Sequence, residues 1–137
     1  MSAAEKDINT ALSVRLAEFQ TAGNPPIAYE NAAFTPVDGE LYLLETFIPN
    51  IKDQLGLGHS SADDYEGLYQ ITVNDSRSNR RFTAQEQARL LMLHFPRGAE
   101  YTFNSVKVKI TSARVSQGVT EEGWYSVPVT IEWRAIV

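Results

Sequence analysis

The chain of 137 residues contains no cysteine and only two histidines. Without thiols it has no disulfides, no zinc-thiolate or iron-sulfur ligands and no cysteine nucleophile. Its length suffices for a core without such links, since a chain of this size buries roughly two-thirds of the surface that its unfolded form exposes. No targeting segment is recognisable, and no apolar run approaches the roughly 18 residues that span a bilayer. We expect one domain over residues 1–137, with no membrane partner, made in a cytoplasm.

Basic residues are also scarce, and they are unevenly distributed. The net charge is -5, which argues against a domain built mainly to bind nucleic acid, because such a domain needs a basic surface. Up to Asp75 the chain has 12 acidic and 3 basic residues, whereas from Ser76 onward it has 5 acidic and 9 basic residues. One half of the sequence is therefore acidic and the other half basic.

Two segments have the apolar spacing of amphipathic helices. The first extends from Ser2 to Gln20, and its apolar stripe consists of Ile8, Leu12, Leu16 and Phe19. The second follows Thr83, which has the spacing of a capping box with Glu86, and ends before Pro96. Its apolar stripe consists of Ala84, Ala88, Leu91 and Phe95.

Residue alternation predicts the strands. We expect a short strand in 27–34, one at 40–48 with apolar residues on both faces, one at 68–74, and a closing hairpin of two long strands joined at 118–123. A turn or bulge at Asn104-Ser105 shifts the register, and Pro128 marks part of the last strand as an edge. The segment from Pro49 to Gly67 is expected to be a long loop. The order α-β-β-β-α-β-β predicts a two-layer α+β domain with a mainly antiparallel sheet packed by two α-helices.

Residues that could support chemistry are few. His59 lies beside Ser60, Ser61, Asp63 and Asp64, which are the residue types of a hydrolytic triad, but neighbours on one loop cannot all face one another. The acids Asp63, Asp64 and Glu66 lack the spacing of a calcium loop, and the Gly56-Leu57-Gly58 segment lacks the rest of a nucleotide-binding fingerprint. His94 is expected to be a packed or surface histidine. We therefore expect no catalytic, cofactor-binding or metal-binding residues and no cofactor.

Two further groups of residues allow a structural and a functional interpretation. Arg77, Arg80 and Arg81 form either a solvated loop or a contact for an anion or an acidic partner ahead of a helix N-terminus. Trp124, Tyr125 and Trp133 are either core and hairpin-pairing residues or interface anchors.

Five segments occur in the order FIPN, LGLG, YEGLYQITVND, LHFPRG and VTIEWRAIV. They follow an N-terminal helix, the fourth ends the second helix, and the last ends the closing hairpin. This arrangement resembles the tail terminator-like proteins of long-tailed phages. The resemblance implies an α+β domain without an active site that assembles as a hexameric ring at the head-proximal end of the virion tail. It also implies a tail-tube protein and a head-completion or connector protein as partners. The alternatives are another head-tail joining protein, such as a stopper, and a small-ligand-binding or hydrolytic α+β domain that uses the 49–67 loop.

A ring requires heterologous contacts, in which one patch of a subunit meets a different patch of the next. The uneven charge suggests a hypothesis for this contact. Arg77, Arg80 and Arg81 would meet acidic residues of a neighbouring subunit or stacked ring, with Asp53, Asp63, Asp64 and Glu66 as candidates. The Pro49–Gly67 loop would be mobile in the monomer and become ordered on assembly.

Overall fold

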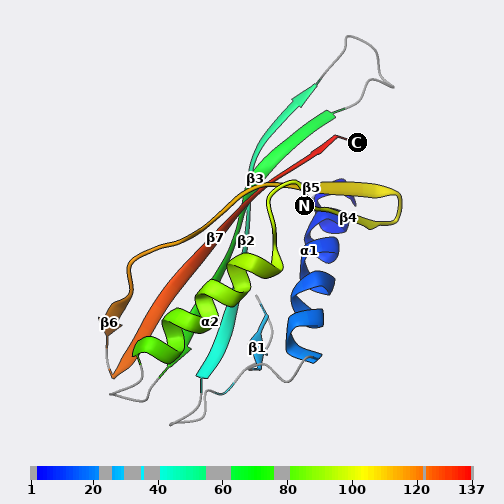
Figure 1. The fold of residues 1–137 in the computed structure, drawn as a ribbon. Coiled ribbons are helices and arrows are strands. Elements are labelled where there is room, and N and C mark those ends of the chain that lie inside the picture. The colour runs from blue at the N-terminus through cyan, green and yellow to red at the C-terminus, as the bar shows by residue number, and fades with distance from the viewer. Residues whose placement is uncertain are drawn as a thin grey trace.

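A computed structural model describes residues 3–21, 26–29, 35, 41–54, 63–75, 81–121 and 123–136. Two helices and seven strands lie in these ranges (Figure 1). In chain order they are α1 (Ala3–Thr21), β1 (Ile27–Ala28), β2 (Leu41–Gln54), β3 (Asp63–Asp75), α2 (Arg81–His94), β4 (Glu100–Phe103), β5 (Val106–Val115), β6 (Val119–Glu121) and β7 (Trp124–Ile136).

Helix α1 buries the apolar stripe that its sequence predicts. Ile8, Leu12 and Leu16 are fully buried and Phe19 is nearly so, which confirms the helix and its buried face. Each such side chain contributes roughly 1.5–3 kcal/mol when it leaves water, so the stripe holds α1 against the sheet. Ser2, where the predicted helix begins, lies outside the described residues.

Helix α2 also buries its predicted stripe, because Ala84, Ala88, Leu91 and Phe95 are all fully buried. The predicted capping box is wrong. The helix begins at Arg81, so Thr83 lies inside it. Glu86 accepts a hydrogen bond from Arg89, with 2.6 Å between Nη2 and Oε1, on the exposed surface of the helix.

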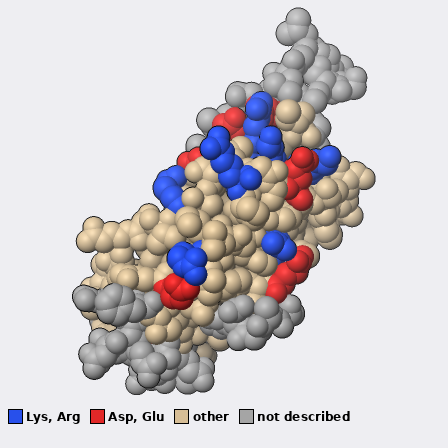
Figure 2. Space-filling model, in the orientation of Figure 1, with Lys and Arg blue, Asp and Glu red and all other residues tan. Residues whose placement is uncertain are grey.

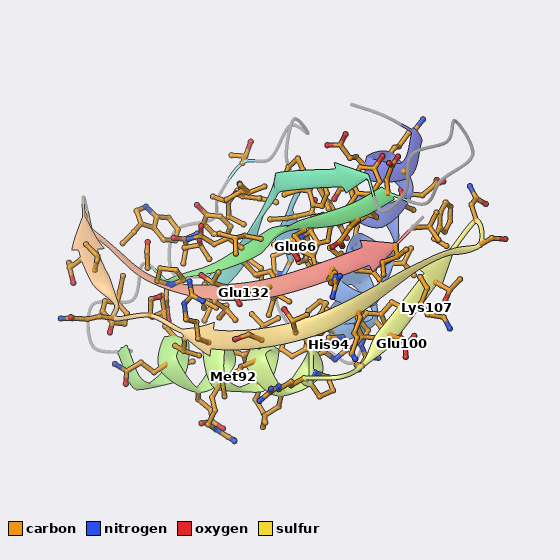
Figure 3. All side chains as sticks on the ribbon, turned by 90° about the horizontal axis from the view of Figure 1, so that it is seen from above. Glu66, Met92, His94, Glu100, Lys107 and Glu132 are labelled. Atoms are coloured by element: carbon orange, nitrogen blue, oxygen red, sulfur yellow. The ribbon has the colours of Figure 1, made fainter. Side chains whose placement is uncertain are left out.

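The strands form one mixed sheet in the order β1-β2-β3-β7-β5-β4, with β6 beside β7. Only the β1–β2 pair is parallel among the described strands. The α+β class is therefore confirmed, but the order has two more short strands, β4 and β6, than the sequence predicted. Seen from above, the sheet curves strongly (Figure 3), so a flat two-layer packing does not describe it.

Most of the segment expected to be a long loop is strand. Strand β2 continues through Pro49 to Gln54, and β3 already begins at Asp63, so that the two pair from Leu41↔Asp75 to Gln54↔Asp63. A bulge between Pro49 and Ile51 absorbs the residue that cannot donate to the ladder. The expected 49–67 loop is therefore wrong for 49–54 and 63–67, while 55–62 lie outside the described residues. The ordering of this segment on assembly stays a prediction.

Gly67 explains why the sequence misled here. It lies inside β3, where an added Cβ would come within 2.5 Å of the Ile48 carbonyl oxygen and 2.6 Å of the Trp133 ring. Glycine is thus required by close packing rather than by a turn.

Strand β7 is the second strand of the closing hairpin and lies inside the sheet, with β3 on one side and β5 on the other. Its alternate residues Val127, Val129, Ile131, Trp133 and Ala135 are buried, as predicted. Pro128 does not mark an edge strand, because β7 is interior. The Pro128 carbonyl accepts a hydrogen bond from the Ser116 amide. Because the carbonyl and the nitrogen of one residue point to the same side of an antiparallel strand, the Pro128 nitrogen faces the gap between the β5 and β6 ladders, where no donor is needed.

The turn predicted at Asn104-Ser105 is confirmed. Both residues have positive φ, 49° and 67°, the conformation of a two-residue turn that matches the twist of paired strands. It joins β4 to β5 and changes which alternate residues face the core.

We call the sheet surface that packs against α1 and α2 the core face, and the opposite surface the outer face. Trp133 is fully buried on the core face and stacks on Phe47, with ring centroids 5.5 Å apart and planes inclined by 9°. Trp124 instead makes an edge contact with Tyr42, at 5.4 Å between centroids. The structural interpretation of these two tryptophans is therefore confirmed.

Candidate assembly surfaces

The four acidic residues predicted as contacts lie at one end of the β2–β3 hairpin. Asp53 on β2 is the ladder partner of Asp64 on β3, and Asp63 and Glu66 lie within two residues of Asp64. Strand pairing thus brings together residues from two separate sequence segments. One end of the hairpin is therefore acidic. The sequence did not predict this structural cluster, because the segment was expected to be a loop.

Arg134 of the same chain contacts two of these acids, Asp64 and Glu66. Arg134 on β7 donates two hydrogen bonds to the Asp64 carboxylate, at 2.9 and 2.8 Å, and its Nε lies 3.8 Å from Glu66. These hydrogen bonds lower the pKa of Asp64 below its ordinary value. The Glu66 side chain stays 48% exposed, so it is the better candidate for a contact with another molecule.

The predicted basic residues are less well located. Arg77 and Arg80 lie outside the described residues, and Arg81 is the first residue of α2. Helix α2 follows the end of β3 at Asp75, whereas the acidic residues lie around its start at Asp63. The start of α2 at Arg81 therefore follows the end of β3 opposite to the one that carries the predicted acids.

Other basic residues, which the sequence reading did not single out, lie on and beside β5. This strand carries Lys107, Lys109 and Arg114 and no acidic residue. Arg114 bonds Glu132 on β7 at 2.9 Å, and Lys107 lies 3.4 Å from Glu100 on β4. The labels of Lys107 and Glu100 in Figure 3 mark β5 and β4, which form the edge of the sheet away from β2. Figure 2 shows basic and acidic side chains next to each other on the face drawn there.

A buried polar cluster links α1 to the sheet. Glu45 on β2 is 4% exposed and accepts hydrogen bonds from Ser13 of α1, at 2.5 Å, and from the Tyr69 hydroxyl. Burial and the nearby Glu45 carboxylate raise the pKa of Tyr69 well above its ordinary value. The prediction that β2 is apolar on both faces is thus wrong at Glu45, whose polar contacts allow a carboxylate on the core face.

His94 is a packed histidine, as predicted. Its ring makes edge contacts with Phe19 and Phe95, with centroids 5.3 and 5.4 Å apart. Burial lowers its pKa below the ordinary value of 6.5. His59, the other candidate, lies outside the described residues.

Several shallow surface features remain. A groove of about 630 Å³ lies between the end of α2 and β5, with Met92, Leu93 and Arg97 among its lining residues.

No group of three potential metal-ligating side chains occurs in the described ranges. Neither α1 nor α2 is both long and apolar enough to cross a membrane.

Comparison with known proteins gives consistent matches. A sequence model of the family described as "Phage tail terminator protein" matches residues 7–133. One solved structure, which carries no functional description, has a TM-score of 0.80 at 21% identity, with 98% of this chain and 96% of that chain covered. A chain from a structure described as "Virion of native gene transfer agent (GTA) particle" has a TM-score of 0.64 at 12% identity, with both chains fully covered. No curated protein matches this chain.

Proposed function

The chain belongs to the phage tail terminator family, whose members are structural proteins of the virion tail, and on this premise we propose that it caps the tail tube as a hexameric ring. The ring ends polymerisation of the tube and forms the surface to which the head joins. Its partners are other copies of this chain, the tail-tube protein and a head-completion or connector protein.

The observation that carries this proposal is the family match over nearly the whole chain, from residue 7 to residue 133. The fold is shared over the full length of the chain from the gene transfer agent particle. That shared fold supports a role in a particle of similar design, although fold alone does not assign a function.

The arrangement of charges supports a head-to-tail contact. A closed ring requires two different, complementary patches on each subunit. The predicted acids lie around the start of β3 at Asp63, whereas α2 begins at Arg81, beyond the end of β3 at Asp75. We therefore retain the hypothesis that Arg77, Arg80 and Arg81 contact Asp53, Asp63, Asp64 or Glu66 of a neighbouring subunit or a stacked ring.

Glu66 is a stronger candidate than Asp64. Asp64 already receives two hydrogen bonds from Arg134, and breaking them would oppose a new contact. Glu66 is about half exposed, and 3.8 Å from Arg134 it makes only a weak ion pair. A neighbouring arginine can approach Glu66 without displacing its present partner.

The direct test is negative-stain electron microscopy of the concentrated protein mixed with purified tail tubes. We expect six-fold rings at one end of each tube. A stopper or other head-tail joining protein would bind a terminator-capped tube but leave bare tube ends uncapped. Persistent monomers that ignore both would contradict the proposal.

A further inference from the structure

One border of the sheet is open along the second half of β5. Strand β4 pairs with β5 from Val106 to Lys109, and backbone hydrogen bonds with Gly98 and Ala99 extend this cover to Ile110. Beyond Ile110, no strand in the described ranges pairs with this side of β5. The elements that surround this stretch, α2, β4 and β7, all lie within the described ranges.

The backbone groups of Ala113 and Val115 point toward the open side. The Ser116 amide donates to the Pro128 carbonyl on β7, so Ser116 faces β7. Because successive residues of an antiparallel strand bond alternately to its two sides, Ala113 and Val115 face away from β7. Their outward amides and carbonyls have no backbone partner among the residues that the structure describes. An added strand can therefore form hydrogen bonds with both residues.

An apolar groove adjoins this open edge. It is the 630 Å³ groove at the end of α2, with Thr111, Ser112 and Ala113 on its strand side and Leu93 on its helix side. Figure 3 shows α2 beside β5 at this border of the sheet. Leu93 is 55% exposed, and Val115, further along the strand, is 37% exposed. An added strand would therefore find apolar side chains against which its own can pack.

Two basic side chains beside the groove have no partner. Arg97 is the one charged residue that lines the groove, and Lys109 precedes it on β5; both are exposed. Neither side chain forms an ion pair or hydrogen bond with another residue in the described ranges. Lys107 and Arg114 of β5 are instead paired with acids of the neighbouring strands. The surface around the open edge therefore has an uncompensated positive charge.

This charge favours an acidic strand over a second copy of the same edge. Pairing of two β5 edges would bring Arg97 and Lys109 of both copies together, and neither β5 nor the groove lining has an acidic residue to offset them. Side chains of a strand alternate between the two faces of a sheet. Apolar residues of an added strand can thus lie with Ala113 and Val115 on the core face, while acidic residues lie on the outer face, which carries Arg114.

We propose that the edge of β5 from Ser112 to Val115, together with the groove at the end of α2, binds an extended segment of a partner protein in which acidic and apolar residues alternate. The segment adds a strand to the sheet through the backbone of Ala113 and Val115. Its apolar side chains pack against Leu93 and Val115, and its acidic side chains complement the positive charge of this border. The inference adds a binding surface to the proposed function and does not depend on ring formation.

A synthetic peptide tests this surface without knowledge of the natural partner. The probe is a blocked, fluorescently labelled peptide in which glutamate alternates with valine, and the reference is the same peptide with lysine in place of glutamate. Fluorescence anisotropy up to millimolar protein gives the dissociation constants, and hydrogen exchange locates the binding. We expect the glutamate peptide to bind at least about tenfold more tightly than the lysine peptide, and to slow exchange at Ala113 and Val115.

Two substitutions separate the backbone contact from the charge. Ala113→Pro removes an amide that faces the open side, where an edge strand tolerates proline, so circular dichroism should stay unchanged while peptide binding weakens about fivefold, as for a lost hydrogen bond. Arg97→Gln should weaken binding of the glutamate peptide by up to about fivefold. Arg89→Gln is the matched control, because it removes the same charge from α2 at a residue that pairs with Glu86 and does not line the groove.

Several results would overturn the inference. Unchanged exchange at Ala113 and Val115 at saturating peptide would exclude the edge contact, and equal affinity for the two peptides would exclude an acidic partner. Slower exchange at the same amides when the protein alone is concentrated would assign the edge to a second copy. Equal losses of binding in Arg97→Gln and Arg89→Gln would show that the groove does not select the peptide. Rings that cap tubes but bind no peptide would contradict this inference and leave the proposed function standing.

Discussion

Arg15 and His94 join the two helices by a reciprocal exchange of hydrogen bonds. The Arg15 guanidinium donates from Nε and Nη2 to the His94 carbonyl oxygen, at 3.1 and 2.9 Å. In return, Nε2 of His94 lies 2.7 Å from the Arg15 carbonyl oxygen. The His94 carbonyl is the last in α2, where helix geometry leaves carbonyls without intrahelical donors. Arg15 of α1 supplies the two shorter bonds to it, and the Tyr101 hydroxyl of β4 donates a third at 3.3 Å.

Loss of the Arg15 side chain should therefore destabilise the fold. We expect Arg15→Ala to lower the free energy of unfolding by about 1.5–3 kcal/mol, the range for hydrogen bonds from a charged donor. Arg89→Ala is the control, because Arg89 pairs with Glu86 on the exposed side of α2 and such pairs contribute about 0–1 kcal/mol. Urea denaturation of both variants measures the difference. Equal losses in the two variants would refute the structural role of Arg15.

His94 should make stability depend on pH. Burial lowers its pKa in the folded protein below the ordinary value of 6.5, so the unfolded chain binds a proton more readily. The free energy of unfolding should then decrease as the pH falls from about 6.5 toward the lower pKa of the folded state. In the His59→Asn variant only one imidazole remains, and its NMR titration gives the pKa of His94 directly. A midpoint at or above 6.5 would contradict the prediction.

Removal of the Tyr69 hydroxyl should leave the buried Glu45 carboxylate short of a donor. We expect Tyr69→Phe to cost about 1–3 kcal/mol of stability, because the penalty falls on a buried acceptor. Tyr125→Phe is the matched control, since that hydroxyl accepts a hydrogen bond from Gln85 at the exposed surface. Thermal and urea unfolding of the two variants should differ clearly. If the two cost the same, the hydrogen bond from Tyr69 to Glu45 does not stabilise the fold.

Charge reversal tests the proposed contact between subunits. The double variant R80E/R81E should assemble poorly at low salt, where unscreened repulsion from the acidic end of the hairpin is strongest. Adding Glu66→Arg to the same chain should restore part of the assembly by reversing both sides of the contact. Mass photometry of the oligomers gives the measurement. Unaltered ring formation by R80E/R81E at low salt would end this hypothesis.

The sequence predicted those elements whose signal is local. The stripe from Ile8 to Phe19 lies within α1, and the stripe from Ala84 to Leu91 lies within α2, with Phe95 just beyond its end. The alternation after Tyr125 lies within one strand, so nearby residues suffice to identify all three patterns. The predicted strands were shorter than β2 and β3, because proline and glycine usually interrupt strands and these segments contain Pro49 and Gly67. A bulge at Pro49 and close packing of Trp133 against Gly67 make both residues compatible with the sheet.

Contacts between distant segments could not be predicted from local pattern. The acids around Asp64 were recognised as a group, but their partner Arg134 is 70 residues away in the chain. The charge asymmetry seen along the sequence becomes an asymmetry across the sheet only because β3 pairs with β2 and β5 pairs with β7. Strand order, which decides this, depends on tertiary packing rather than on neighbouring residues.

The growth of tail tubes tests the central claim most directly. Purified tube protein is allowed to polymerise, the protein is added during growth, and tube length is followed by light scattering and electron microscopy. We predict that growth stops at the lengths present when the protein is added, with one ring per capped end. Continued elongation at the rate seen without the protein, with bare tube ends, would contradict the account.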